Sequence, residues 1–343
     1  MPSEDQIRES LDEVLVPTAM RSIVKLNLVR QVIISDGKID ISLATAALQS
    51  TSQDWLKKKV HDAIIHLPGA EKAEVGIEFV QAEPKELNQI DHVVAVMSGK
   101  GGVGKSLVTA LLGLSLARRG YEVGILDADI TGPSIPRIFG IASRPGGSDT
   151  GLLPVLSHLG IEIMSINLLL PNEDDAVIWR GPLIAGTIKQ FWEDVLWGRL
   201  DYLLVDLPPG TADAPLTVMQ SLPLSGVVIV SSPQELAGMV VRKAVNMARD
   251  SMHIPILGVV ENMSYLRIPD TGKRLDVFGK SRADEMARAA AAPLLGRIPI
   301  ETELAQLCDQ GDIERYDSDI LNSLAETFLK AISTRARLSE VQT

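Results

Sequence analysis

Cysteine is nearly absent from this sequence of 343 residues, in which Cys308 stands alone. One cysteine excludes an internal disulfide framework, so small disulfide-rich secreted folds do not fit and a reducing, cytoplasmic location is expected. Long apolar runs are missing too: stretches such as Gly226 to Val230 are far shorter than the roughly 20 residues of a membrane-spanning helix. The N-terminus, Met-Pro-Ser-Glu-Asp-Gln, is acidic and has no signal-peptide pattern, so we expect no membrane partner.

A basic surplus is absent from both parts of the chain. The formal net charge is -11, and a division at Ile90 gives 10 Lys and Arg against 14 Asp and Glu before it, and 23 against 30 after it. Nonspecific nucleic-acid binding depends on clustered positive charge. We therefore expect no nucleic-acid partner.

The length exceeds that of a typical single core, so we expect two domains. Residues 1–82 predict a small α/β domain, in which Asp36-Gly37 separates two strand-like runs, a strong hairpin signal. A first helix is expected from Ile7 to Leu15, and a second one is expected over 56–67. A last strand covers about 73–80. Residues 83–90 are polar, contain Pro84 and are expected to form a linker.

Residues 91–343 alternate apolar runs with helical patterns, as in a parallel sheet covered on both faces. The predicted class is α/β, a doubly wound and mostly parallel P-loop sheet preceded by the small α/β domain. We expect Arg144 to Gly151, which is rich in glycine, to be a mobile loop. Strands are predicted at 93–97, 122–126, 161–165, 202–205, 227–230, 256–260 and 294–298, and helices at 107–119, 184–195, 237–250 and 282–292.

Residues 93–106 read Val-Val-Ala-Val-Met-Ser-Gly-Lys-Gly-Gly-Val-Gly-Lys-Ser, a buried-type strand that runs into a glycine-rich turn. Glycines let successive backbone N–H groups converge on phosphate oxygens, and the following helix directs its positive dipole end at them. Lys105 can reach the outer phosphates, and Ser106 can bind Mg²⁺. ATP and Mg²⁺ are therefore the predicted ligands. The residues expected to bind the nucleotide here are Gly99, Lys100, Gly101, Gly102, Val103, Gly104, Lys105 and Ser106.

Two other interpretations of this loop stay open. Gly99, Gly101 and Gly104 also satisfy Gly-x-Gly-x-x-Gly, and Asp127 follows about one βαβ unit later, so a dinucleotide site is a rival. That motif does not account for Lys105-Ser106. A glycine-rich turn without any ligand is the second alternative.

Carboxylates follow two other predicted strands. Asp206 ends the apolar run 202–205, at the place of the second carboxylate that holds Mg²⁺ through water in P-loop enzymes. Asp127 and Asp129 follow the strand after the phosphate loop. Because ligands bind at the carboxyl ends of parallel strands, these side chains are expected at the nucleotide. Residues 207–213, Leu-Pro-Pro-Gly-Thr-Ala-Asp, leave the same edge and are expected to act as a switch that senses the γ-phosphate.

Lys100, directly after the first glycine, is a second lysine that an ordinary phosphate loop does not need. It indicates the deviant loop, in which this side chain crosses a dimer interface and stabilises developing charge on the partner's phosphates. A solvated loop lysine is the alternative. Lys100, Lys105 and Asp129 are thus the predicted catalytic residues of a homodimer.

Several motifs carry a family resemblance. Residues 100–106 resemble the deviant-loop ATPases that include MinD, ParA and the nitrogenase iron protein. The resemblance narrows to the Mrp/ApbC family of iron–sulfur cluster carriers, and the first 82 residues are similar to the small domain often fused to that family. The segments that carry it are Asp127–Ser134, Trp179–Pro182, Leu207–Thr211, Ser232–Gln234 and Glu261–Ser264.

The resemblance implies roles for matching positions. It implies that Asp129 orients the attacking water, that Asp127 lies beside the Mg²⁺ held by Ser106 and Asp206, and that Asn262 hydrogen-bonds adenine. Pro299, in Arg297-Ile-Pro299, is implied near the base. Arg180 is a weaker candidate for gripping a partner or the nucleotide.

The sequence departs from the family at its cluster ligands. Family members follow Glu-Asn-Met-Ser-Tyr with Cys-Pro-x-Cys-Gly, and two chains pool four thiolates; here Ile268 and Thr271 occupy the two cysteine positions. The small domain's customary cysteine, expected around 47–51, is missing as well. A homodimer offers only two copies of Cys308, in a predicted surface helix, whereas clusters commonly need four thiolates. A bridging iron–sulfur cluster would therefore need foreign ligands.

Three functions follow. The resemblance implies an ATP-hydrolysing homodimer that assembles or carries iron–sulfur clusters for a client or scaffold protein. An ATP-gated adaptor or regulatory switch that never binds a cluster is the alternative. A MinD- or ParA-like positioning ATPase comes third; the acidic charge and the amphipathic stripe of Ile320, Leu324 and Phe328, which few basic residues flank, count against it.

Overall fold

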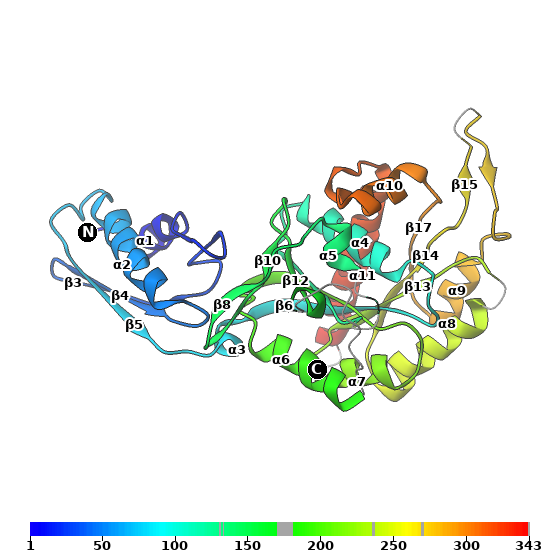
Figure 1. Ribbon diagram of the computed structural model, residues 1–343, viewed down its shortest axis with the longest axis horizontal. Coiled ribbons are helices and arrows are strands. Elements are labelled where there is room, and N and C mark those ends of the chain that lie inside the picture. Colours follow the sequence, from blue (N-terminus) through cyan, green and yellow to red (C-terminus); the bar gives the residue numbers. More distant parts are fainter. Residues whose placement is uncertain (130–131, 133, 170–180, 235–236, 269–270, 342–343) are drawn as a thin grey trace. The chain divides into compact units, whose positions relative to one another are not determined.

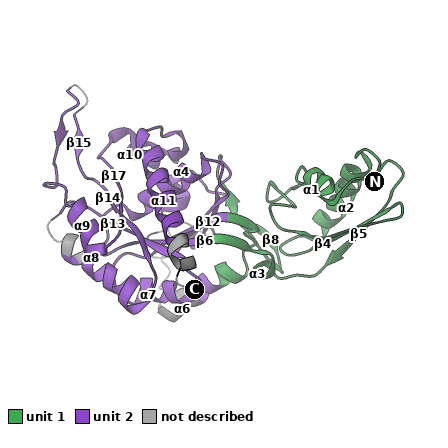
Figure 2. Ribbon diagram, turned by 180° about the vertical axis from the view of Figure 1, so that it is seen from behind, with its two compact units in different colours: residues 1–91, 144–156, 190–200 green, residues 92–143, 157–189, 201–343 purple. Residues whose placement is uncertain are grey.

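The computed structural model describes residues 1–343 except 130–131, 133, 170–180, 235–236, 269–270 and 342–343. The chain divides into two compact units (Figure 2). The first unit comprises Met1–Asp91, Arg144–Leu156 and Gln190–Leu200, and the second comprises His92–Ser143, Ser157–Lys189 and Asp201–Thr343. The domain limits at residues 82 and 91 stay a prediction. Among the described residues, no helix combines the length and the apolar character needed to cross a bilayer.

The first unit is built on a three-stranded sheet in the order β3-β4-β5. β3 and β4 form the predicted hairpin around Asp36-Gly37, with Ser35 opposite Lys38. Gly37 has a φ of 80°, which a side chain would disfavour. β5 runs parallel to β4. The elements of this unit are α1 (Glu4–Leu11), β1 (Leu15–Val16), β2 (Arg21–Ser22), β3 (Val29–Ser35), β4 (Lys38–Ala44), α2 (Ser50–Ile65), β5 (Glu74–Val80), α3 (Pro84–Leu87), β8 (Gly146–Ser148), β9 (Gly151–Leu153) and β10 (Val155–Leu156).

Two local predictions in the first unit need correction, and the segment expected as a linker, whose role stays a prediction, contains regular structure. The first helix ends at Leu11, because Leu15 and Val16 pair with β2 instead. The expected linker 83–90 contains α3, whose start is capped by Glu83 and Glu86, and the first residues of β6. The expected mobile loop 144–151 contains β8, which pairs with β9, so this segment forms a short hairpin.

The predicted doubly wound sheet has eight strands in the order β10-β11-β7-β12-β6-β13-β14-β17, and all of them except β10 contribute to the second unit. The neighbours β11-β7, β7-β12, β6-β13, β13-β14 and β14-β17 pair in parallel. Besides β10, whose bounds are given above, the strands of this sheet are β6 (Gln89–Ser98), β7 (Val123–Asp127), β11 (Glu162–Ser165), β12 (Arg199–Asp206), β13 (Gly226–Ser231), β14 (Ile256–Glu261) and β17 (Leu294–Arg297). Each of the seven predicted strands is confirmed within a few residues.

Helices cover both faces of this sheet, with α4 and α11 on one side and α7 and α8 on the other (Figure 1). The strands between them are apolar because neither face meets water. The helices are α4 (Lys105–Ala117), α5 (Ile135–Ile138), α6 (Gly181–Glu193), α7 (Asp213–Ser221), α8 (Ala237–Val245), α9 (Ala283–Ala290), α10 (Thr302–Gln310) and α11 (Asp319–Val341), with a π-helical turn at Asn246–Ser251 and 3₁₀ turns at Ile166–Leu169 and Ile313–Arg315. Trp179 and Arg180 lie outside the described residues.

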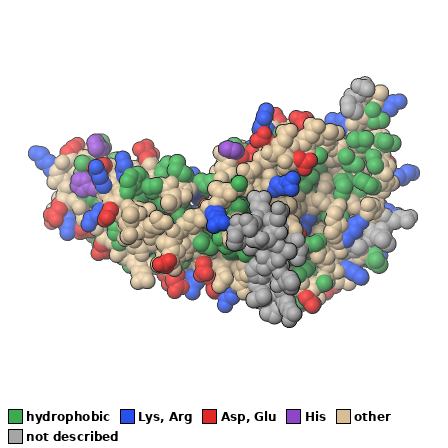
Figure 3. All heavy atoms as spheres, viewed as in Figure 1, with side chains coloured by type: hydrophobic (Ala, Val, Ile, Leu, Met, Phe, Trp, Pro, Cys, Tyr) green, Lys and Arg blue, Asp and Glu red, His purple; other side chains and the backbone are tan. Residues whose placement is uncertain are grey.

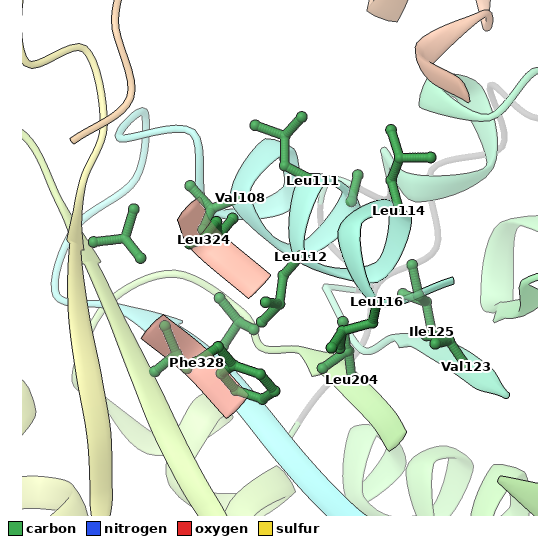
Figure 4. Close-up of a cluster of buried hydrophobic side chains, with 14 of the residues drawn as sticks. Val108, Leu111, Leu112, Leu114, Leu116, Val123, Ile125, Leu204, Leu324 and Phe328 are labelled. Atoms are coloured by element: carbon green, nitrogen blue, oxygen red, sulfur yellow. The ribbon is translucent and has the colours of Figure 1, made fainter. Parts of the chain in front are cut away.

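The core of the second unit joins the phosphate-loop helix to the sheet and to the last helix. Side chains from α4, from β7 and β12, and from α11 converge in one apolar cluster (Figure 4). Phe328 of α11 is fully buried, and its ring lies edge-on to Tyr202, with the centroids 5.8 Å apart. The apolar stripe of the C-terminal helix therefore packs against the body of the second unit.

Replacing Phe328 should measure what this packing contributes. Phe328→Ala removes a fully buried ring, and we expect the unit to lose about 3–5 kcal/mol of unfolding free energy. Phe278→Ala is the matched control, because Phe278 is 40% exposed, and it should change stability by about 0.5 kcal/mol or less. Urea unfolding followed by circular dichroism gives both values. Equal shifts for the two variants would contradict this description of the core.

Candidate nucleotide site

The phosphate loop connects the end of β6 to the start of α4. Gly102 and Gly104 have φ angles of 76° and 75°, a conformation that glycine adopts without strain. Gly104 also caps α4, whose first residue is Lys105. The backbone N–H groups of the first helical turn lack partners within the helix, so this turn can bind an anion.

Asp206 lies at the centre of the site. It ends β12, is fully buried, and receives three polar groups of the phosphate-loop helix. Oδ2 lies 2.7 Å from Lys105 Nζ and accepts a 2.5 Å hydrogen bond from Ser106 Oγ. Oδ1 accepts a 2.7 Å bond from Thr109 Oγ1. A buried carboxylate needs such partners, because burial without them is costly.

Lys105 is only 5% exposed, and its ammonium sits between two carboxylates. Its Nζ is 3.7 Å from Asp129 Oδ2 as well as 2.7 Å from Asp206 Oδ2. Asp129, expected to orient water, is therefore within reach of the lysine expected to bind phosphate. The structure brings together the three predicted residues Lys105, Asp129 and Asp206; their catalytic roles stay predictions.

Asp127 lies directly beside Asp206, because these two residues are register partners on β7 and β12. It is fully buried and accepts hydrogen bonds from the backbone N–H groups of Asp129 and Ile135, each 3.2 Å long. Ser165, its register partner on β11, donates a 3.3 Å bond. Burial and the neighbouring Asp206 raise the pKa of Asp127 to about 8, although Lys105 works in the opposite direction.

The donor set suits Mg²⁺ in the manner of phosphate-loop enzymes. Ser106 Oγ and Asp206 Oδ2 are hard oxygen donors that already lie side by side. Among the described residues there is no cluster of three His, Cys, Asp or Glu that would hold a metal by itself. Mg²⁺ does not need such a cluster, since it usually takes one or two protein oxygens plus water and phosphates. Ser106 and Asp206 therefore fit the ion together with a bound polyphosphate.

Asn262 makes a contact that the sequence did not predict. It follows β14 and is 2% exposed, and its Nδ2 donates a 2.9 Å bond to the carbonyl of Val103 in the phosphate loop. A Cβ on Gly104 would come within 2.1 Å of the same Nδ2 atom. Asn262 thus braces the loop and explains why position 104 has no side chain. Its predicted bond to adenine stays a prediction.

Pro299 follows β17 and lies beside this segment, because Ser264 donates a 2.9 Å backbone bond to Ile298. Pro299 is buried. Arg297 donates hydrogen bonds to Ser281 Oγ at 3.1 Å and to Asp284 Oδ2 at 2.7 Å. The predicted base-binding segments after β14 and β17 are therefore neighbours.

The segment expected to act as a switch runs beside the phosphate loop. Leu207 and Gly210 donate backbone bonds of 3.1 and 2.9 Å to Val96 and Ser98 of β6. A Cβ on Gly101 would lie 3.9 Å from Pro209. Movement of this segment would therefore be felt at the phosphate loop, and its role as a switch stays a prediction.

Two further contacts at the site were missed from the sequence. Thr109 lies one helical turn after Lys105, and that i, i+4 spacing could have identified it. Gln234 accepts a hydrogen bond from Nζ of Lys100, across 134 positions of sequence. No local pattern predicts the second contact, because it depends on the order of strands in the sheet.

The positions that hold cluster ligands in the resembling family lie in a two-stranded hairpin, β15 (Leu266–Arg267) and β16 (Arg274–Leu275). Ile268 and Thr271 lie in its turn. Both ends of the hairpin are fastened to the buried carboxylate of Glu261: Ser264 and Ser281 donate hydrogen bonds to its Oε2. Hydrophobic side chains gather on the surface around this hairpin (Figure 3).

Cys308 does not supply the missing thiolates. It lies half-buried on α10, and burial raises the pKa of its thiol to about 11, with a smaller contribution from Asp309. The thiolate is the form that binds metal. A protonated single thiol does not fit a cluster that usually needs four thiolates.

Comparisons with known proteins match both units. The model described as NUBPL iron-transfer P-loop NTPase, of the ParA type, matches residues 89–334, and the model described as iron-sulfur cluster assembly protein matches residues 4–77. The iron-sulfur cluster carrier protein of Deinococcus radiodurans is 37% identical over 349 residues, which cover 98% of this chain and 97% of that protein. The carrier protein of Clostridium perfringens is 47% identical over 235 residues, 66% of this chain and 82% of that protein.

Similarity extends to solved structures. The nucleotide-binding protein of Archaeoglobus fulgidus, solved in complex with ADP, is 50% identical with a TM-score of 0.62, over 69% of this chain and 94% of that chain. The matched share of this chain is about as long as the second unit, which contains the phosphate loop. The dinucleotide alternative and the turn without a ligand both lose support.

A glycine substitution tests the brace on the phosphate loop. Gly104→Ala adds a Cβ that meets Asn262, whereas Gly120→Ala, at φ 85°, adds one in open space and serves as the control. The left-handed conformation costs about 1–2 kcal/mol in both variants, so only Gly104→Ala should lose more stability than that in thermal unfolding. In an Asn262→Ala background, which lacks the amide, adding Gly104→Ala should cost no more than Gly120→Ala costs in the unmodified chain. Equal losses for the two single variants would contradict the brace.

Proposed function

Since the chain belongs to the ParA-type family of NUBPL iron-transfer P-loop NTPases, we propose that it binds and hydrolyses ATP as a homodimer in the assembly or carriage of iron–sulfur clusters. The observation that carries the ATPase is Asp206, whose carboxylate gathers Lys105, Ser106 and Thr109 at the start of one helix. This arrangement puts a cation, a hydroxyl and free helix amides around one small volume. Such a volume suits a polyphosphate tail.

ATP would bind by replacing one of the two carboxylate partners of Lys105. Its ammonium is held by Asp206 and Asp129, and a γ-phosphate would take the place of one carboxylate. Ser106 and Asp206 would hold Mg²⁺, which neutralises phosphate charge when it is bound. The loop amides stay fixed, because the glycine conformations and the brace from Asn262 set them in advance.

Hydrolysis would be an in-line attack of water on the γ-phosphate. Asp129, 8% exposed and next to Lys105, would align that water. Lys100 would stabilise the developing charge from the second copy of the chain, as an arginine finger does. Asn262 would bind adenine through the second hydrogen of Nδ2 and the second lone pair of Oδ1, since Nδ2 also donates to Val103 and Oδ1 also accepts from the Met263 N–H. Pro299 would lie near the base.

In this proposal the iron–sulfur cluster is the cargo that the chain helps to assemble or carry. Relatives that span nearly the whole chain are named iron-sulfur cluster carrier proteins, which supports a client or scaffold in iron–sulfur metabolism as the partner. The chain's own thiol does not fit a conventional bridging cluster, so further ligands would come from that partner.

The single thiol per chain favours one second candidate, an ATP-gated adaptor that docks partners and never binds a cluster.

We also propose the domain limits 1–82 and 91–343 with a linker at 83–90. A cytoplasmic location is proposed as well, because the one cysteine is a free thiol.

The ATPase is tested by two substitutions at the site. Asp129→Asn should keep Mg·ATP binding and lower turnover about 100-fold or more, because it removes the group that aligns water. Lys105→Gln keeps a donor toward Asp206 but lacks the charge, and it should weaken ATP binding up to about 100-fold, as expected for a charged contact of up to about 3 kcal/mol.

Calorimetry with a slowly hydrolysed ATP analogue and phosphate release give the two quantities, and Lys280→Gln, an exposed lysine, is the control. Analytical ultracentrifugation of Asp129→Asn with ATP should reveal a dimer. Tight binding by Lys105→Gln, or normal turnover by Asp129→Asn, would refute the assignment.

Anaerobic reconstitution tests whether the chain holds a cluster without ligands from a partner. With ferrous iron and sulfide, the chain alone should bind far less than one cluster per dimer, and Cys308→Ala should behave identically, because two thiols per dimer are too few for a cluster that usually needs four. Ile268→Cys/Thr271→Cys restores the family's pair and should acquire iron, sulfide and a thiolate-to-iron absorption band. Stoichiometric iron in the unmodified chain that is lost in Cys308→Ala would support a cluster held by Cys308 instead.

A further inference from the structure

Lys100 has a partner within its own chain. Its ammonium donates a hydrogen bond to Oε1 of Gln234, a contact at the surface of the second unit. Lys100 is half-buried and Gln234 is exposed. Within the described part of the chain, no carboxylate pairs with Lys100, so a neutral amide is the acceptor that holds this cation.

The sheet explains why Gln234 reaches the loop. β13 lies next to β6 with Val230 opposite Ser98, so the chain leaves both strands side by side. Ser231 is fixed on its other side by a 2.8 Å backbone bond from Asn262. Ser232 is 1% exposed, and Pro233 fixes its own φ angle. Gln234 therefore stands at the end of a short, stiff segment.

The backbone of Lys100 is fixed as well. Its carbonyl accepts a 2.9 Å hydrogen bond from Ser98 Oγ, and the carbonyl of Ser98 accepts one from Gly210 in the segment after β12. The position of the Lys100 side chain then depends on what its ammonium binds. Here that acceptor is Gln234.

We propose that Gln234 is a positioning residue for Lys100: it holds the ammonium on its own chain until a polyphosphate on a second copy takes it over. The inference rests on the proposed function, in which Lys100 acts on the partner's nucleotide. A neutral amide suits this task, because charged phosphate oxygens accept hydrogen bonds from a cation more strongly than an amide does. A carboxylate at position 234 would compete far better.

Two near-isosteric variants change, in opposite directions, how strongly residue 234 holds the ammonium of Lys100. Gln234→Glu turns the acceptor into an ion-pair partner and should lower kcat two- to fivefold with little change in KM for ATP, as expected for an exposed pair of about 0.5–1 kcal/mol. This loss should shrink in 0.5 M salt, because exposed charges are screened. Gln234→Met removes the acceptor and should leave kcat equal or higher. Gln310→Glu, an exposed glutamine on α10, is the matched charge control.

The contact between Lys100 and Gln234 can be measured without ATP. Acylation of lysines by an amine-reactive ester, quantified by mass spectrometry on the nucleotide-free chain, should label Lys100 about two- to fivefold faster in Gln234→Met and slower in Gln234→Glu. Exposed Lys273 is the internal reference. Unchanged labelling in both variants would overturn the contact.

A double-mutant cycle separates positioning from a structural effect. In a Lys100→Ala background, Gln234→Glu should change kcat by less than 1.5-fold, because no ammonium is left to hold. An equal loss with and without Lys100, or no loss at all in Gln234→Glu, would overturn the proposal. If the unmodified chain does not hydrolyse ATP, the proposed function fails, while the labelling still decides whether Gln234 holds Lys100.

Discussion

A single buried carboxylate organises the second unit. Asp206 has no contact with water, and its two oxygens depend on Lys105, Ser106 and Thr109 for their hydrogen bonds. Loss of these partners would leave a charge in the core, which proteins rarely tolerate. The strand that carries Asp206 and the helix that carries its partners are therefore held in one relative position. That position also sets the phosphate loop, so the stability of the sheet and the geometry of the site have the same cause.

Neighbouring strands then divide the remaining tasks. The loops after β6, β13 and β14 lie next to one another, and each supports the next: Asn262 bonds to Ser231 and to Val103, and Gln234 bonds to Lys100. The acidic group on the other side comes from β7 and β12. A nucleotide bound at the carboxyl edge of the sheet would contact groups from both sides, as is general for open parallel sheets. None of these loops needs to be long, because the strands bring them together.

The sequence was informative where chemistry is local. The phosphate loop, Asp206 at a strand end and the seven strands follow from spacing and apolar runs within a few residues of each other. The braces were not predictable: Asn262 is 159 positions from Val103, and the contact depends on β14 lying two strands from β6. Short elements were also missed, because β1 and β8 have too few residues to show a period. The roles of Asp129, Asn262 and Pro299 came from resemblance and stay predictions.

The hairpin after Asn262 is fastened at its base. Ser264 and Ser281 donate hydrogen bonds to the same oxygen of Glu261. These bonds close the loop at its base, so they offset the entropic cost of loop closure without contacts at the tip. The stretch 271–280 is exposed throughout, so its side chains contribute little to folding. Evolution can therefore rewrite the tip without unfolding the domain beneath it. Ile268 and Thr271, which stand where the family resemblance leads us to expect cysteines, are consistent with that freedom.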